Sequence, residues 1–445
     1  MRNPHPLQDL IRQRVSGDSV GIYSACTAHP LAIEAVIESA RDSDTYALIE
    51  ATANQVDQFG GYTGMVPAQF AEFVRAKARE AGLEEQRLVL GGDHLGPLVW
   101  SDRKEAEAMA LAEELVRAYV DAGFTKIHID TTMKLADDPA DEPLSDEVIA
   151  KRAARLVAAC EGAYQALVAR SASVDGEPVP LAPVYVIGSE VPIPGGAFDN
   201  EEFLSVTTPE HFEQTYRAFQ EQFTSLGLDD TLERIVAVVV QPGVEFSDAT
   251  VTAYDRKAAA DLTAQLGKHK SIVFEGHSTD YQTREHLKQM VEDGVAILKV
   301  GPALTFALRE ALFALSCIED ELVAEDFTHT YLASNFKDVL LSTMRGDPTH
   351  WKNHYHGTDD EIEEKLKYSL SDRCRYYLAD VEVADAIDTL VKNVDSIGVV
   401  LPLLHHYMPA QYRRVCNDEL PMSATALIKD HIKDRIADYI YATSL

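Results

Sequence analysis

Hydrophobic residues gather in eight short runs rich in β-branched side chains, and stretches with helical periodicity lie between them. Residues 30–42 and 102–123, for example, carry apolar side chains at three- and four-residue spacing, which indicates amphipathic helices. We expect strands at 20–27, 46–51, 88–94, 126–130, 184–190, 235–243, 271–277 and 296–301. Strand and helix therefore alternate eight times along the first part of the chain.

Eight consecutive strand-helix units predict an α/β fold, the (β/α)8 TIM barrel. An open sheet of this size would be expected to carry a Gly-rich nucleotide loop, GxGxxG or GxxxxGKS/T, and the sequence contains neither. The chain becomes mostly helical after Gly301. We assign residues 1–322 to the barrel, with 303–322 as its eighth helix. Residues 323–445 are then a C-terminal α-helical extension packed on the barrel.

The composition narrows the classes of partner. The chain has 445 residues and a net charge of -32, which repels polyanions, so we expect no nucleic-acid partner. Its five cysteines are widely separated and form no CxxC motif, so neither a disulfide framework nor a structural zinc site is indicated. The sequence shows neither a signal peptide nor a membrane-spanning run. These features predict a cytoplasmic protein without a membrane partner.

Three of the expected strands end in side chains that can bind a metal ion. His94 ends the third strand, Glu190 the fifth and His277 the seventh. Because the carboxyl ends of barrel strands meet at one rim, all three should project into the same mouth. Two imidazoles and a carboxylate, with one position open for water or substrate, form a common catalytic metal set. We therefore predict a divalent ion at these residues, zinc or alternatively manganese.

Further ionisable residues at the same rim are candidates for catalysis. Asp93 directly precedes His94 and is a possible acid/base if the strand turns at this point. Glu50 and Asp130 end the second and fourth strands, where clustered carboxylates suit proton transfer, although Asp130 is alternatively a helix N-cap. Lys299 ends the eighth strand, where its ammonium would neutralise an oxyanion or phosphate, or alternatively form a Schiff base. Beside a metal ion we favour the electrostatic role.

The loops at this rim supply candidate substrate-binding residues. The loops after the seventh and eighth strands are where barrels often bind phosphate, and they contain Ser278, Thr279 and Gly301. Neither segment, 276–283 or 300–305, includes an arginine for a phosphate, so a sugar without phosphate is also compatible. The remaining candidates are Asn54 and Gln55 in the polar, Gly-rich segment 54–64, and Gln241 after the sixth strand. By contrast, His29, His128, His405 and His406 are interpreted as structural or surface residues.

Several longer motifs are similar to those of a known family. These are GIYSACTAHP, IEATANQVDQFGGYTGM, LGGDHLGP, YVIGSEVPIPGG, VVVQPGVEF, EGHSTDYQT and LKVGPALTFALREALFAL, followed by YSLSDRCRYY and LPLLHHYMPAQY. With them the chain resembles the accessory-subunit family of tagatose-1,6-bisphosphate aldolase, GatZ/KbaZ, from about residue 20 to its carboxyl-terminal region. Members of that family have been described as non-catalytic subunits that stabilise a class II aldolase, as putative tagatose-6-phosphate kinases and, for some relatives, as hexulose or hexuronate 4-epimerases.

A weaker resemblance links the chain to the metal-dependent class II aldolases, which are also barrels. It implies that His94 and His277 are metal ligands, while Glu190 stands where those enzymes have a third histidine. Together these features favour a metal-dependent 4-epimerase of a ketohexose or its phosphate, acting by retro-aldol and aldol steps in tagatose and galactitol metabolism. The alternative is a non-catalytic partner of a class II aldolase subunit, and a homo-oligomer stays open. A kinase is less favoured, because no Gly-rich phosphate loop is present.

Overall fold

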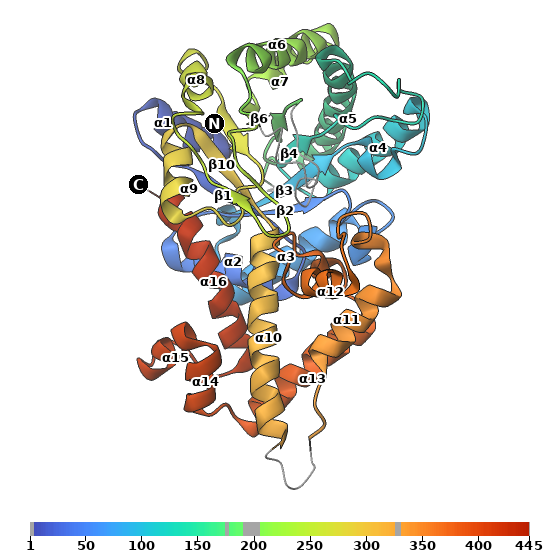
Figure 1. The fold of residues 1–445 in the computed structure, drawn as a ribbon. Coiled ribbons are helices and arrows are strands. Elements are labelled where there is room, and N and C mark those ends of the chain that lie inside the picture. Colours follow the sequence, from blue (N-terminus) through green and yellow to red (C-terminus); the bar gives the residue numbers. More distant parts are fainter. Residues whose placement is uncertain (1–3, 174–177, 190–204, 325–330, 445) are drawn as a thin grey trace.

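The computed structural model describes residues 4–173, 178–189, 205–324 and 331–444. Glu190, one of the predicted metal ligands, lies outside these ranges. Eight parallel strands close into a barrel, as predicted, in the order β1-β10-β9-β6-β5-β4-β3-β2 (Figure 1). They are β1 (Ile22–Cys26), β2 (Ala47–Thr52), β3 (Leu88–Leu95), β4 (Lys126–Ile129), β5 (Val184–Ile187), β6 (Ile235–Val240), β9 (Val273–Gly276) and β10 (Val295–Val300). Each begins within two residues of the start of its predicted run.

Helices cover the outside of the barrel in the alternation that the sequence predicts. They are α2 (Pro30–Ser43), α3 (Pro67–Ala81), α4 (Glu105–Asp121), α5 (Asp146–Ala172), α6 (Pro209–Ser225), α7 (Asp229–Leu232), α8 (Ala260–Thr263) and α9 (Arg284–Glu292). A short antiparallel pair, β7 (Glu245–Phe246) with β8 (Val251–Thr252), is inserted after β6 and was not predicted. Two-residue strands leave no hydrophobic run that a periodicity argument would detect.

The barrel interior is apolar at the amino-terminal ends of the strands. Helix α1 (Pro6–Val15) packs there with inward-facing residues of the strands in one buried cluster, which includes Leu48, Val273 and Ile297. Side chains two residues apart on a strand share a face. The next inward positions along these three strands are Glu50, Glu275 and Lys299, so the interior changes from apolar to charged within one step toward the carboxyl ends.

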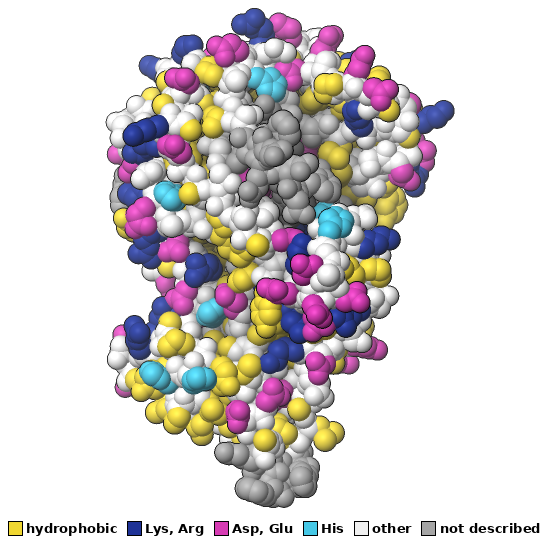
Figure 2. Space-filling model, viewed as in Figure 1, with side chains coloured by type: hydrophobic (Ala, Val, Ile, Leu, Met, Phe, Trp, Pro, Cys, Tyr) yellow, Lys and Arg dark blue, Asp and Glu magenta, His cyan; other side chains and the backbone are white. Residues whose placement is uncertain are grey.

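The remaining helices form the carboxyl-terminal part of the chain, which lies beside the barrel in Figure 1. They are α10 (Pro302–Ala324), α11 (Phe336–Gly346), α12 (Asp359–Tyr368), α13 (Val381–Ile397), α14 (Leu401–Tyr407), α15 (Pro409–Cys416) and α16 (Ala424–Thr443). None of the described helices is both long and apolar enough to cross a membrane. On the face shown in Figure 2, acidic and basic side chains of the described residues are interspersed, without a continuous field of Lys and Arg.

The segment expected to be the eighth barrel helix has a different position. Helix α16 packs against α2, α9 and β1, which is the place between the first and seventh barrel helices, whereas α10 packs against α13 and α16. The prediction for 303–322 was wrong in this respect. Residues 303–322 are apolar on most faces, so several different neighbours can bury them, and chain order alone does not decide which helix covers the last strand.

Candidate functional site

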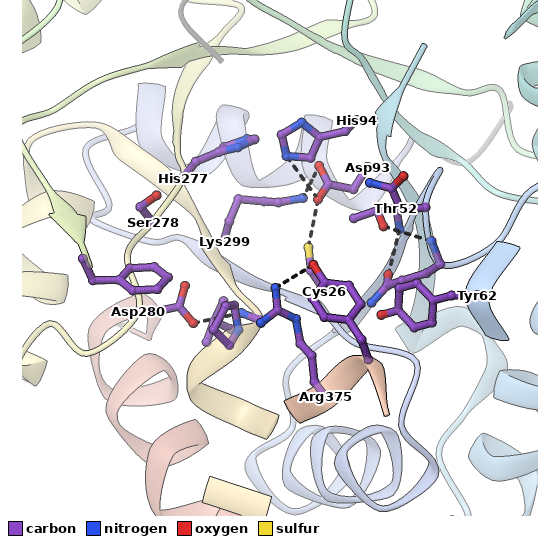
Figure 3. Close-up of a pocket in the computed structure, with 17 residues that line it drawn as sticks. Cys26, Thr52, Tyr62, Asp93, His94, His277, Ser278, Asp280, Lys299 and Arg375 are labelled. Atoms are coloured by element: carbon purple, nitrogen blue, oxygen red, sulfur yellow. Dashed lines mark hydrogen bonds and ion pairs between the residues drawn. The ribbon is translucent and has the colours of Figure 1, made fainter. Parts of the chain in front are cut away.

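The carboxyl end of the barrel holds a cavity of about 90 Å³ that is lined mainly by polar side chains (Figure 3). Eight of the residues predicted for the site line it: Asn54, Gln55, Asp93, His94, His277, Ser278, Lys299 and Gly301. In a cavity measured this way one water needs roughly 10–15 Å³, so several waters or a small polar ligand fit. The prediction that these strand ends meet is therefore confirmed for the described residues.

Other predicted residues lie beneath or outside the cavity. Glu50 and Asp130 are buried behind its wall. Thr279 is buried and its hydroxyl donates to the Lys299 carbonyl at 2.6 Å, so it supports the strand rather than facing a ligand. The Gln241 Oε1 atom accepts from the backbone N–H groups of Gly243 and Val244, and its predicted place at the cavity was wrong. An amide side chain that forms hydrogen bonds with its own loop has its acceptor satisfied there.

A local irregularity places both Asp93 and His94 on the cavity. The pairing of β3 with β4 shifts register between Gly92 and Leu95, and His94 has a positive φ of 48°. Such a bulge turns adjacent side chains toward the same side instead of opposite faces. Gly91 is also required, because a Cβ atom at this position would lie 2.6 Å from Glu50 Cγ. The GGDH sequence thus makes room for one carboxylate and presents another with an imidazole.

Beneath the cavity lies a buried network of opposite charges. The Lys126 ammonium lies 2.5 Å from Glu50 and 2.6 Å from Glu275, and all three side chains are fully buried. Lys299 forms ion pairs with Glu50 and, at 2.7 Å, with Asp93. Burial alone would lower the pKa of both lysines, but the carboxylates outweigh it and raise the pKa of each, that of Lys299 well above its usual range. Both ammonium groups are therefore charged and held in place.

Three imidazole rings meet at the upper edge of this network. The ring centroids of His94, His128 and His277 lie 5.0–5.1 Å from one another. Each ring has one nitrogen beside a carboxylate: His94 Nδ1 at 2.9 Å from Asp130, His128 Nδ1 at 2.8 Å from Asp93, and His277 Nε2 at 3.0 Å from Glu275. In His94 and His277 the carboxylate fixes the ring and its tautomer, which leaves the other nitrogen for a ligand. His128 Nδ1 has a second partner, since it accepts the backbone N–H of His94 at 3.1 Å.

The charges around these rings shift their pKa values in different directions. Burial disfavours the charged form of His94, but Asp93 and Asp130 outweigh it and raise its pKa. For His277, burial dominates and lowers the pKa to about 3, so this imidazole is neutral near neutral pH. Burial would raise the pKa of Asp93, but His94, Lys299 and His128 hold it well below its usual range. The cavity therefore presents a carboxylate and a neutral imidazole together.

The sequence interpretation missed several of these residues. His128, interpreted as structural or surface, joins Asp93, Glu275 and His277 in a group whose ligand atoms all lie within 4.8 Å of one another. The signal was present in the strand sequences, because His128 precedes Asp130 by two positions and Glu275 precedes His277 by two. At the end of β1, the Cys26 thiol donates to Asp93 at 3.2 Å and lines the cavity.

The C-terminal helices also contribute to the cavity. Arg375 and Tyr376, in the short 3-10 helix η7 (Arg373–Tyr376), line it together with Tyr62 from the loop after β2. The Tyr376 ring lies 5.1 Å from that of Tyr62 and stacks on His350 at 4.6 Å, and the Arg375 guanidinium lies 4.5 Å from the Tyr376 ring centre. This aromatic contact joins residues more than 300 positions apart, so no local pattern could have indicated it.

Comparison with solved structures identifies a similar protein over the whole chain. A crystal structure of a probable tagatose 6 phosphate kinase from Sinorhizobium meliloti 1021 is 41% identical, with a TM-score of 0.83, and the match covers 95% of this chain and 100% of that one. A putative fructose-1,6-biphosphate aldolase from Coccidioides immitis is 16% identical, with a TM-score of 0.40, 87% of this chain and 96% of that chain being covered.

The sequence also matches a family model over residues 7–444, which is nearly its full length. That family is described as D-tagatose-1,6-bisphosphate aldolase subunit GatZ/KbaZ-like. Both the extent of the match and the 41% identity to a solved relative agree with the resemblance seen in the motifs. The chain belongs to the GatZ/KbaZ-like family, which is linked to tagatose-bisphosphate aldolase and carbohydrate metabolism.

Proposed function

We propose that the protein is a metal-dependent 4-epimerase of a ketohexose, which interconverts fructose-type and tagatose-type sugars by retro-aldol cleavage and re-addition. The observation that supports this best is the group of three imidazoles, each backed by a carboxylate, at a polar cavity in the barrel mouth. This arrangement combines possible metal ligands with groups that can hold protons on sugar hydroxyls.

The residues present fit a divalent ion on two grounds. The Nε2 atom of His128 is buried and has no hydrogen-bond partner among the described residues, which is costly for a polar atom unless a ligand uses it. In the described part of the chain the cluster also contains four buried carboxylates, of Glu50, Asp93, Asp130 and Glu275, against two ammonium groups, of Lys126 and Lys299. With neutral imidazoles it carries two excess negative charges, which a divalent cation would balance.

The proposed ligands are His94 and His277, as the sequence predicts, together with His128. Glu190 stays a predicted ligand outside the described residues. Zinc is the first expectation and manganese the alternative, because imidazole nitrogen suits both. When bound, such an ion polarises the ketose carbonyl and the neighbouring hydroxyl.

The remaining roles follow from position on the cavity. Asp93 lines it and stays ionised, so we assign it to accept the proton of the C4 hydroxyl as the C3–C4 bond breaks. Lys299, 2.7 Å from Asp93, stabilises the negative charge that develops on the substrate oxygens. Glu50 and Asp130 do not line the cavity, and we assign them to hold Lys299 and His94 in place. Rotation of the cleaved aldehyde before re-addition inverts C4.

The test uses the purified chain alone with fructose, tagatose and their 6-phosphates. We expect interconversion that chelator stops and metal restores, and no solvent deuterium at C4, because the C4–H bond is never broken. His277→Ala should reduce metal content at least about 10-fold, as should His94→Ala, while His405→Ala is a matched control outside the cavity. Full metal occupancy in both cavity variants would refute the ligand assignment. The metal content of Glu190→Gln tests the predicted ligand outside the described residues.

A second candidate is a non-catalytic subunit that stabilises a class II tagatose-bisphosphate aldolase, which the description of the family favours. Co-expression with a class II aldolase should then give a stable complex, and aldolase activity should be unaffected by Glu190→Gln. Failure to co-purify, together with unchanged aldolase activity, would remove this candidate. The kinase activity in the description of the Sinorhizobium relative does not fit this chain, whose sequence lacks a Gly-rich phosphate loop.

A further inference from the structure

Cys26, at the end of β1, is a cavity residue that the proposed reaction does not use. Its thiol donates a hydrogen bond to Asp93 Oδ2 at 3.2 Å and lies 3.5 Å from Glu50 Oε2. Figure 3 shows its sulfur facing the Asp93 carboxylate. Because Asp93 is assigned to take the substrate proton, a side chain in contact with this carboxylate can influence that step.

The two oxygens of the Asp93 carboxylate have different surroundings. Oδ1 lies 2.7 Å from the Lys299 ammonium and 2.8 Å from His128 Nδ1. Among the described residues, the hydrogen-bond partner of Oδ2 is the Cys26 thiol, since His94 Nε2 is 3.8 Å away. An oxygen held beside an ammonium is stabilised in its ionised form and is a poor proton acceptor. The oxygen that can take the proton of the C4 hydroxyl is therefore Oδ2.

The Cys26 thiol is a neutral donor rather than an anion. Burial raises its pKa well above the usual range, and the negative charge of Asp93 raises it further, against the opposing effect of Lys299. An S–H group is a weak donor and its sulfur a weak acceptor, whereas the hydrogen bond from a hydroxyl to a carboxylate is strong. The thiol can therefore direct Oδ2 while stabilising the ionised carboxylate little. Once that oxygen is protonated, the thiol can turn and accept a hydrogen bond from it.

Packing holds the thiol in this position. Cys26 pairs with Glu50 across β1 and β2, and a Cβ atom at Gly301 would lie 3.0 Å from the Cys26 carbonyl oxygen and 3.5 Å from its Cβ atom. The chain after β10 therefore passes close against the end of β1. We propose that Cys26 is a positioning residue for Asp93, whose thiol directs Oδ2 toward the substrate and binds it weakly enough for this oxygen to take the proton. The inference rests on the proposed function, to which it adds the reacting oxygen and the residue that selects it.

The kinetic test compares serine with alanine at this position, with D-fructose as the substrate of the metal-loaded protein. Cys26→Ser gives Oδ2 a stronger donor and should lower kcat by about 10-fold, with KM changed by less than about 2-fold. Cys26→Ala removes the donor and should lower kcat by only about 3-fold. A role in packing alone predicts the opposite order, because serine keeps the shape of cysteine and alanine leaves a gap. A serine variant as active as the alanine variant, or more active, would overturn the proposal.

The chain offers a matched control in a second pair of a thiol and a carboxylate. The buried Cys374 thiol donates to Asp372 Oδ1 at 3.3 Å, but Cys374 does not line the cavity. Cys374→Ser should leave both kcat and KM unchanged. A fall in kcat as large as that of Cys26→Ser would show that the effect of serine does not depend on the contact with Asp93.

Alkylation by iodoacetamide tests the contact itself and needs no turnover. The thiolate is the form that reacts, so removing the negative charge in Asp93→Asn should make Cys26 react at least about 10-fold faster, measured by mass spectrometry of its peptide. The rate at the exposed Cys416 should stay the same and serves as the internal control. An unchanged rate at Cys26 would contradict its contact with Asp93, whether or not either protein converts a ketose.

Discussion

The two ends of the barrel interior are built by the same strands and use opposite chemistry. At the amino-terminal ends of the strands, Leu48, Val273 and Ile297 pack with α1. One inward position further along the same strands stand Glu50, Glu275 and Lys299, which are equally buried but charged. Buried apolar side chains stabilise a fold, whereas buried ion pairs scarcely do so after their desolvation cost. We therefore interpret the charged layer as a support that holds the cavity residues Asp93, His277 and Lys299 in position.

The first test of this comparison removes the central cation of the charged layer, Lys126. Lys126→Met removes the shared partner of Glu50 and Glu275, whose side chains are fully buried. We expect a loss of roughly 3–5 kcal/mol in the free energy of unfolding, because removing one member of a buried ion pair leaves an uncompensated charge. Urea denaturation measures it. Adding Glu275→Gln should recover part of the loss, and a single variant as stable as the original protein would mean that these charges are not buried as described.

A second test changes the apolar end, where we expect a loss of stability without an effect on the site. Leu48→Ala removes a fully buried side chain next to α1 and should cost roughly 2–5 kcal/mol through lost burial and the cavity left behind. Metal content and the pH profile of activity should stay unchanged, since Leu48 packs in the apolar cluster with α1 and does not line the cavity. Metal analysis of the folded variant checks this, and a loss of metal would show that the two ends are coupled.

A third test concerns Asp280, whose pKa is raised to about 6 by burial. Because the folded protein binds this proton more tightly than the unfolded chain, Asp280 contributes stability below about pH 4, and the contribution is lost as the pH rises through about 6. The asparagine in Asp280→Asn does not ionise, so this variant does not lose that stability as the pH rises. We expect it to gain at most about 3 kcal/mol relative to the original protein between pH 4 and pH 8. Denaturation at both pH values measures the gain, and a pH-independent difference would exclude it.

The smallest effect is expected from the same ion-pair pattern on the outside. Lys429 of α16 lies 2.5 Å from Glu38 and 3.3 Å from Glu34 of α2, much as Lys126 faces two glutamates, but these side chains are 18–21% exposed. Water screens such pairs, so Lys429→Met should cost at most about 1 kcal/mol, and less in high salt. A cost equal to that of Lys126→Met would show that burial does not separate the two networks.

Much of the fold could be predicted because it depends on local patterns. The β-branched runs and the helices between them give the barrel, and the rule that parallel strands end at one rim brings His94, His277 and Lys299 to one cavity. The inward positions of His128 and Glu275 were also readable from the two-residue alternation on their strands, although that reading was not made for them. Both belong to the group that also contains Asp93 and His277.

The amino-acid sequence by itself determined the family, the order of the strands and the residue types at their carboxyl ends, because each of these is encoded within a few neighbouring positions. Tertiary structure alone decided which distant segments complete the barrel and its cavity. It places α16 beside β1 and brings Arg375 and Tyr376 to Tyr62. It also puts the Asp280 carboxylate on the amides of Gly301 and Ala303. Such contacts depend on how whole elements pack, and packing joins residues whose separation along the chain carries no periodic signal.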